Sequence, residues 1–158
     1  MRWICSILWL VLALACGGPV GPFPGGQLSG REHPYPRDGF GFAAAEERVA
    51  VEVGGNSPHS VHTWAIVLED TLFIPADFFN PGKRWPQLAM DDPRARIRVV
   101  EEVYPCRLLR IEDGELIDRL RAATAEKYEI EPDSWAARIE VWWFRIERRR
   151  TPGPHPLD

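Results

Sequence analysis

Residues 70–99 read DTLFIPADFFNPGKRWPQLAMDDPRARIRV, and this stretch carries strand, loop, helix and strand signals in turn. Residues 71–74 predict a strand that follows a polar turn. Pro86 suits the first turn of a short helix, because proline needs no amide partner there and its φ is already helical. In the run 94–99, apolar residues alternate with arginines, which predicts a strand with one buried and one cationic face.

The same periodicities place further elements on both sides of this stretch. Strands are predicted over residues 49–53, 61–68, 103–111 and 140–148. Asp113 stands at the N-cap position of an amphipathic helix that runs on to Tyr128. The patterned residues, 46–150, therefore predict one α+β domain with a mainly antiparallel sheet of about six strands and two to three helices.

Length and charge set limits on the class of protein. A chain of 158 residues with 45% hydrophobic and 27% charged residues is expected to fold as a single globular domain. The net charge is -4 and the sequence pI is about 5.6. A protein held to nucleic acid mainly by phosphate contacts needs a basic surface, so no nucleic-acid partner is expected.

The N-terminus predicts an export signal. Arg2 precedes an apolar run from Trp3 to Ala15 in which only Ser6 is polar. This run is about 20 Å long as a helix, too short for a bilayer core of about 30 Å, so residues 1–15 are read as a signal peptide. Cys16 follows small residues as in the lipobox of bacterial lipoproteins and is the predicted lipidation site, which places the protein in the cell envelope on a membrane anchor. Ordinary secretion after Ala15 is the alternative.

Glycine and proline content distinguishes two segments outside the patterned domain. Residues 16–45 are rich in glycine and proline and are interpreted as a tether, because such sequence buries little apolar surface. The last eight residues, 151–158, are interpreted as a proline-rich tail. Once a signal peptide and a lipidated cysteine are set aside, Cys106 alone remains. A lone cysteine forms no intrachain disulfide, so Cys106 is expected to be a small buried hydrophobic residue.

Three segments resemble the split β-barrel superfamily, which includes pyridoxamine-phosphate-oxidase-like flavoproteins and deazaflavin-dependent nitroreductases. They are residues 70–99, the strand and helix over 103–128, and the aromatic run Trp142-Trp143-Phe144-Arg145-Ile146. The resemblance covers residues 46–148 and implies a split β-barrel fold, a homodimer, and FMN or a deazaflavin as cofactor. Fold transfers more securely than function between such proteins.

The resemblance also implies where a cofactor would bind. In the superfamily, lysine and arginine side chains near the short helix hold the cofactor phosphate, and Lys83 and Arg84 match that region. Fixed cations and unpaired amides suit a phosphate group. Trp85 offers a stacking face, and polar side chains precede it on the strand over 61–68. The predicted cofactor-binding residues are Lys83, Arg84, Trp85, His62, Thr63 and Trp64.

Each feature also has an ordinary structural interpretation. Lys83 and Arg84 could be solvated or contact acidic residues such as Asp91 and Asp92. His59 and His62 are three residues apart on a strand, so they face opposite sides and do not predict a metal site. Two functions therefore remain open: a flavin-binding or deazaflavin-binding protein, with a nitro-type or quinone-type reductase activity, and a non-catalytic envelope lipoprotein that binds another ligand or partner.

Overall fold

The computed structural model describes residues 17–77, 82–131, 134 and 139–149. The predicted signal peptide, the predicted lipidation site Cys16 and the predicted tail over 151–158 lie outside the described residues. Among the helices that are described, none combines the length and the apolar character that crossing a membrane requires.

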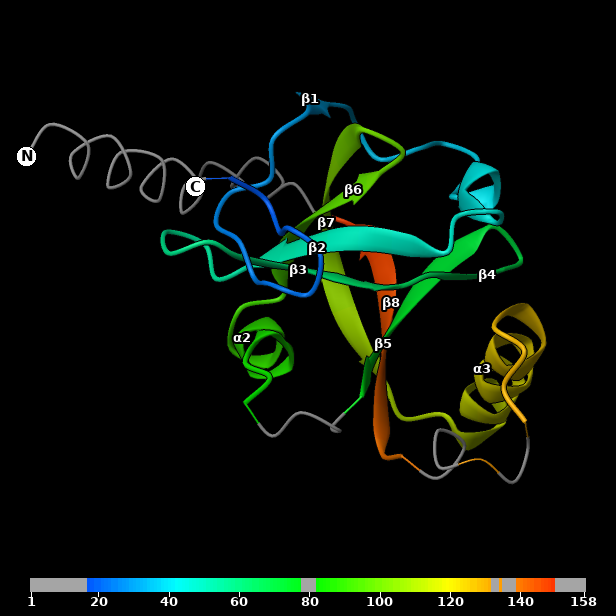
Figure 1. Ribbon diagram of the computed structural model, residues 1–158. Coiled ribbons are helices and arrows are strands. Elements are labelled where there is room, and N and C mark those ends of the chain that lie inside the picture. The colour runs from blue at the N-terminus through cyan, green and yellow to red at the C-terminus, as the bar shows by residue number, and fades with distance from the viewer. Residues whose placement is uncertain (1–16, 78–81, 132–133, 135–138, 150–158) are drawn as a thin grey trace, which may run out of the picture.

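The core of the molecule is a strongly curved sheet of eight strands (Figure 1). Apart from the short β1, which pairs with β7 in parallel, its order is β3-β2-β6-β7-β8-β5-β4 and all neighbours are antiparallel. The strands are β1 (Arg31–Glu32), β2 (Arg48–Val53), β3 (His59–Trp64), β4 (Ile66–Leu68), β5 (Thr71–Asp77), β6 (Arg94–Val99), β7 (Glu102–Ile111) and β8 (Val141–Arg148).

The two ends of this sheet meet because β3 and β4 follow one another in the chain. Ala65 separates them, and its amide donates to the hydroxyl of Tyr128 at 3.0 Å. The hydroxyl of Thr63 on β3 donates to the Pro75 carbonyl on β5 at 2.8 Å, which joins the two ends. The strand predicted over 61–68 is thus two strands with a bend between them. This bend and the short β1 account for eight strands where about six were predicted.

The concave face of the sheet encloses the main hydrophobic core. Alternate residues of β2, β5, β6, β7 and β8 point into it, as the sequence periodicity predicts. Helix α2 (Trp85–Asp91) closes one side with Trp85, whose ring packs on Phe144 with ring centroids 5.3 Å apart. Cys106 is fully buried in this core, and burial raises the pKa of its thiol to about 12. The prediction of a buried, unpaired cysteine is confirmed.

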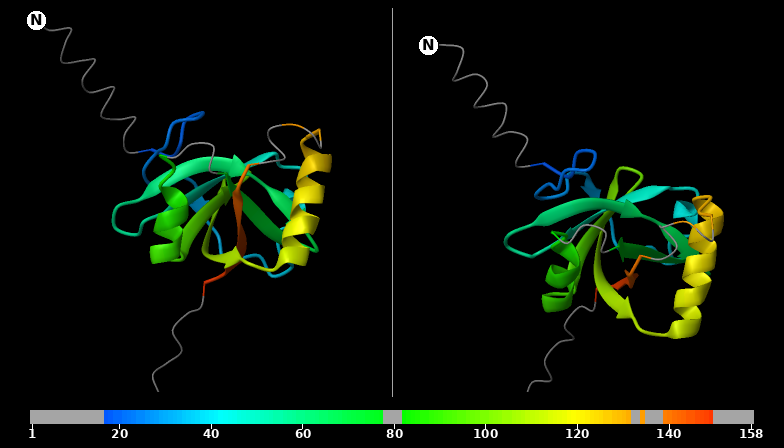
Figure 2. Two further views of the ribbon diagram at one scale, coloured as in Figure 1. Left: turned by 90° about the horizontal axis from the view of Figure 1, so that it is seen from below. Right: turned by 60° about the horizontal axis from the view of Figure 1, so that its bottom comes forward.

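Helix α3 (Gly114–Lys127) covers the convex face over β4, β5, β7 and β8, and lies well apart from α2 (Figures 1 and 2). The Asp113 carboxylate accepts the Leu116 amide at 3.1 Å, so Asp113 is the N-cap that the sequence predicted. Leu120 is fully buried in a second hydrophobic cluster, together with Ile66, Phe73, Ile111 and Trp143.

Residues 17–45 also pack on the sheet, and here the tether interpretation is wrong. Leu28 is buried against Ala50 and Val103, and its amide donates to Glu52 Oε2 at 2.5 Å. Phe40, next to the 3-10 helix η1 (Gly41–Ala43), is fully buried in the main core. Composition suggested a tether because this segment has few apolar residues and no periodicity. Backbone hydrogen bonds and a few well-placed apolar side chains are nevertheless enough to dock it.

Candidate functional site

The six predicted cofactor-binding residues lie on β3 and around the start of α2. Those on β3 point to opposite faces of the sheet. His59, Val61 and Thr63 point into the concave side, since they pair with Val53, Val51 and Val49 of the main core. Ser60, His62 and Trp64 point to the convex side. His59 and His62 therefore face opposite sides, as predicted, and no metal-binding cluster occurs among the described residues.

Lys83 precedes α2 and is held by an acidic neighbour. Its Nζ lies 2.7 Å from Oδ2 of Asp77, the last residue of β5, and its side chain is mostly buried. Asp91 and Asp92 were the expected acidic partners of Lys83 and Arg84, but the partner of Lys83 is Asp77. Because its charge is already compensated, Lys83 is a poor phosphate ligand unless this ion pair opens.

Arg84 is the cation that remains available. Its side chain is exposed and, among the described residues, makes no ion pair. Arg84 is close enough to His59 to affect its titration. The pKa of His59 is lowered, first because the ring is partly desolvated and second because Arg84 adds positive charge. A neutral imidazole beside a free guanidinium provides donors for an anionic group without a second fixed positive charge.

Trp85 does not present a stacking face. Its side chain is 1% exposed and belongs to the main hydrophobic core against Phe144. The predicted stacking role of Trp85 is therefore wrong in this structure. The physical reason is that the first turn of α2 must bury an apolar side chain to dock on the sheet, and Trp85 is the residue that points inward.

His62 and Trp64 are separated from Thr63 and Arg84 by the sheet. The ring nitrogen Nδ1 of His62 is 3.2 Å from the Gly21 carbonyl oxygen, so His62 already contacts the N-terminal segment. The Trp64 indole stacks on Tyr128, with centroids 4.4 Å apart and an interplanar angle of 14°. These residues fix the N-terminal segment and α3. They do not belong to one site with Arg84, which corrects the predicted grouping.

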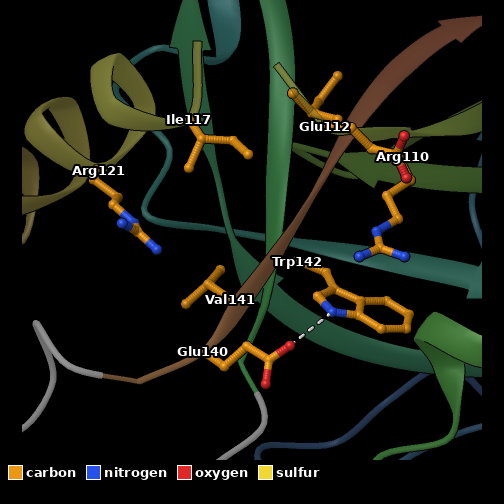
Figure 3. Close-up of a pocket in the computed structure, with 8 residues that line it drawn as sticks. Arg110, Glu112, Ile117, Arg121, Glu140, Val141 and Trp142 are labelled. Atoms are coloured by element: carbon orange, nitrogen blue, oxygen red, sulfur yellow. Dashed lines mark hydrogen bonds between the residues drawn. The ribbon is translucent and has the colours of Figure 1, made fainter. Parts of the chain in front are cut away.

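A hollow of about 370 Å³ lies elsewhere, between α3 and the ends of β7 and β8 (Figure 3). Ile117 and Val141 form its apolar part, and the Arg110 guanidinium carbon lies 3.9 Å from the centre of the Trp142 ring. The indole nitrogen of Trp142 donates to Glu140 at 3.2 Å. The charged residues on its wall are Arg110, Glu112, Arg121 and Glu140. Two arginines and two glutamates balance, so the hollow has no net preference for an anion.

Several residues near Arg84 and in the hollow beside α3 were not predicted from the sequence. His59 was considered only as half of a metal pair, although its parity with Val61 and Thr63 already placed it on the inner face. Arg110 and Arg121 come from a strand and a helix that pack only in three dimensions. Nothing in the linear pattern indicates that their side chains share one hollow.

Comparisons with known proteins bear on the fold. No protein-family model and no curated protein matches the sequence. A candidate pyridoxamine 5′-phosphate oxidase from Listeria innocua superimposes with a TM-score of 0.51 at 12% identity, covering 69% of this chain and 90% of that chain. HutZ, the heme storage protein of Vibrio cholerae, gives a TM-score of 0.53 at 12% identity, covering 70% and 87%.

The fold is a split β-barrel. A candidate 5-nitroimidazole antibiotic resistance protein from Bacteroides thetaiotaomicron shares this fold, with a TM-score of 0.50 at 13% identity over 70% of this chain and 78% of that one. The predicted split-barrel architecture is therefore confirmed. At 12–13% identity the likeness shows the fold alone, so function must be argued from this chain's own residues.

Proposed function

We propose that this chain is a lipid-anchored split-barrel protein of the cell envelope that binds FMN or a deazaflavin at Arg84 and His59. The main support for this proposal is the exposed Arg84 guanidinium. It has no ion-pair partner among the described residues and lies near a neutral His59. The resemblance of residues 70–99 to flavin-binding split barrels supports the same choice of ligand. A flavin would supply hydride chemistry toward a nitro-type or quinone-type acceptor.

The roles proposed for the chain's own residues follow from their surroundings. Arg84 binds the phosphate through its guanidinium, which matches phosphate geometry better than an ammonium does. His59 donates a ring N–H, and its lowered pKa keeps it neutral near pH 7. Lys83 is assigned to the Asp77 ion pair and Trp85 to the core, so neither contributes directly.

Two matched variants test this assignment. Arg84→Ala and Lys83→Ala each remove one positive charge from adjacent positions, so the overall field changes equally. Arg84→Ala should weaken FMN binding by about tenfold or more, because a charge-assisted contact is lost. Lys83→Ala should have a smaller effect. Visible absorbance and fluorescence titrations with FMN and a deazaflavin measure both.

Riboflavin is the matched ligand control, since it carries the same ring without the phosphate. FMN should bind more tightly than riboflavin to the parent protein, and the difference should shrink in Arg84→Ala. Equal binding of FMN and riboflavin, or equal losses in the two alanine variants, would contradict a phosphate site at Arg84. A His59 titration followed by NMR supplies an independent readout. Its pKa should rise in Arg84→Ala, because the neighbouring positive charge is gone.

A second candidate function has its own observation in favour. Lys83 is neutralised and Trp85 is buried, so two residues expected to hold a cofactor are used for structure. This favours a non-catalytic envelope lipoprotein that keeps the scaffold and binds another ligand or partner. A folded, colourless protein that is indifferent to FMN, deazaflavin and riboflavin would select this function.

The proposal includes a homodimer, on the resemblance to split-barrel flavoproteins. Sedimentation equilibrium of the chain from Gly17 onward measures this directly. A monomer at all accessible concentrations would remove the dimer from the proposal and leave Arg84 to be tested within one subunit.

A further inference from the structure

The segment that leads from the proposed anchor to the sheet forms an ordered hairpin with an apolar tip. We call residues 17–26 the N-terminal hairpin. Val20 and Phe23 face each other across the tip, with Val20 N to Phe23 O at 3.1 Å and Phe23 N to Val20 O at 3.0 Å. Both side chains are exposed, Val20 by 59% and Phe23 by 71%. Phe23 is the most exposed of the large hydrophobic residues that the structure describes.

The hairpin is fixed to the split barrel. Gly25 and Ser60 of β3 exchange two backbone hydrogen bonds, at 2.8 and 2.9 Å, and Gly26 N donates to Gly17 O at 2.8 Å. The Gly21 carbonyl also lies against the His62 ring. Figure 2 shows the hairpin, in blue, projecting from the sheet. Its apolar tip is therefore held out from the barrel by contacts that point it in one direction.

The hairpin and its surroundings have the charge pattern of a membrane-contact element. No ionisable side chain occurs from Gly17 to Gly30, so burial of the tip in a lipid interface desolvates no charge. Arg98 of β6 lies beside Gly18, where an added methyl group would meet its Nη1 at 3.6 Å. Arg98 donates to the Ser29 carbonyl at 3.3 Å and, among the described residues, has no carboxylate partner.

The other two arginines of the cationic face of β6 are neutralised. Arg94 pairs with Asp92 at 2.6 Å, and Arg96 pairs with Glu52 at 3.0 Å and with Glu32 at 3.3 Å. Within the described part of the chain, Arg98 is therefore the arginine of this face whose charge has no carboxylate partner, and it lies next to the hairpin. An unpaired guanidinium at the base of a hairpin whose tip is apolar matches the boundary between lipid phosphates and acyl chains.

The position of the hairpin in the chain indicates which surface its tip contacts. Val20 is four residues after Cys16, which limits the separation of their Cα atoms to about 14 Å even in an extended chain. Resting on the proposed lipid anchor, we propose that the Val20–Phe23 tip enters the interface of the same bilayer, with Arg98 at the phosphate level. The contact adds a second membrane signal to the acyl anchor and fixes the orientation of the barrel.

Site-specific fluorescence on the full chain tests this contact. Cys106 is fully buried, so an environment-sensitive NBD dye attached at Pro24→Cys reports on the tip alone once Cys16 is acylated. Phe42→Cys is the matched control, because Phe42 is 52% exposed and lies on η1, away from the hairpin. The vesicles contain phosphatidylethanolamine and phosphatidylglycerol. On them, the probe at position 24 should brighten by at least about twofold and be quenched by brominated lipid. The probe at position 42 should do neither.

Two sets of variants relate the signal to the proposed residues. Val20→Ser/Phe23→Ser should return the probe at position 24 to its aqueous intensity, whereas Phe42→Ser should leave it unchanged. Arg98→Gln should reduce the dependence on phosphatidylglycerol, and Arg94→Gln, which removes a paired charge, should not. Identical responses at positions 24 and 42 on vesicles that retain the acylated protein would overturn the proposal.

These experiments test the proposed acyl anchor and the proposed hairpin contact independently. An intact mass without an acyl group at Cys16 would refute the anchor, and the hairpin is then tested with the chain from Gly17 on anionic vesicles. Binding that disappears in Val20→Ser/Phe23→Ser would support the tip, and no binding would overturn it. A sedimentation experiment in which the same double variant converts a dimer to a monomer would also overturn it, by assigning the tip to a contact between two copies.

Discussion

The convex face of the sheet is covered in two different ways. Over β4, β5, β7 and β8, helix α3 presents a row of apolar side chains, with Leu120 fully buried in a cluster of five. Over β2, β6 and β7, residues 27–32, which include the short β1, form a mostly irregular layer that contributes one buried leucine, Leu28. The helix relies on apolar burial, whereas the irregular segment relies on hydrogen bonds and ion pairs, chiefly Glu52 with Leu28 N and Arg96.

The C-terminal end of α3 is fixed to the segment before β2 and to the bend between β3 and β4. Lys127 Nζ donates to the carbonyl oxygens of Ala44 at 2.9 Å, Glu46 at 2.6 Å and Ala65 at 2.8 Å. Burial lowers the pKa of this lysine, while Glu46 and Glu47 act in the opposite direction. A sheet face can therefore be covered with few apolar contacts when the backbone N–H and C=O groups of the covering segment are hydrogen-bonded. Four experiments test whether the coverings differ as described.

The largest effect is expected from truncation. A chain that begins at residue 46 loses Leu28 and Phe40, both buried, together with the contacts of Glu52. It should fail to fold, because the sheet then exposes one convex region and the main core loses a fully buried aromatic ring. Circular dichroism against the chain from Gly17 measures this. A stable, cooperatively unfolding domain from residue 46 would restore the tether interpretation.

A matched pair of leucine variants compares the two coverings directly. Leu120→Ala should lower the free energy of unfolding by about 3–5 kcal/mol, since it leaves a cavity among large neighbours. Leu28→Ala should cost about 2–3 kcal/mol, because Leu28 contacts a smaller cluster. Urea denaturation gives both values. If Leu28→Ala cost as much as Leu120→Ala, the irregular segment would depend on apolar burial after all.

The polar contribution is tested at Glu52. Glu52→Gln keeps the shape of the side chain but removes the charge that Arg96 and the Leu28 amide contact, and should cost about 1.5–3 kcal/mol. The matched control is Glu69→Gln, which breaks the exposed pair with Arg119 and should cost less than about 1 kcal/mol. Thermal or urea unfolding in parallel measures the difference. Similar costs would show that the Glu52 network does not fix the N-terminal segment.

The smallest effect is expected at the start of α3. Asp113→Ala removes the acceptor for the Leu116 amide and should cost about 1 kcal/mol. Asp113→Asn should retain most of the stability, because asparagine caps nearly as well. Hydrogen exchange of the first turn of α3 reports the local effect. Loss of stability in both variants alike would point to a role of the charge and not of the cap.

The sequence by itself determined the elements whose periodicity is local. The alternation in 94–99, Pro86 at the start of α2 and the Asp113 cap each fix a strand or helix through contacts between near neighbours. The opposite facing of His59 and His62 follows from the same period of two. The burial of Cys106 was expected because a lone cysteine behaves as a small hydrophobic residue. The split-barrel fold was also correctly predicted, from the order of these elements and the resemblance they carry.

Tertiary structure alone decided which polar groups are available. Lys83 and Arg84 are adjacent in sequence, yet Asp77 neutralises Lys83 and leaves Arg84 exposed. Trp85 became a core residue because α2 turns it toward Phe144. The docking of residues 17–45 and the free charge of Arg98 depend on partners many residues away. Local sequence carries no record of such pairings, because they are set by the register of the sheet and by the path of the chain across it.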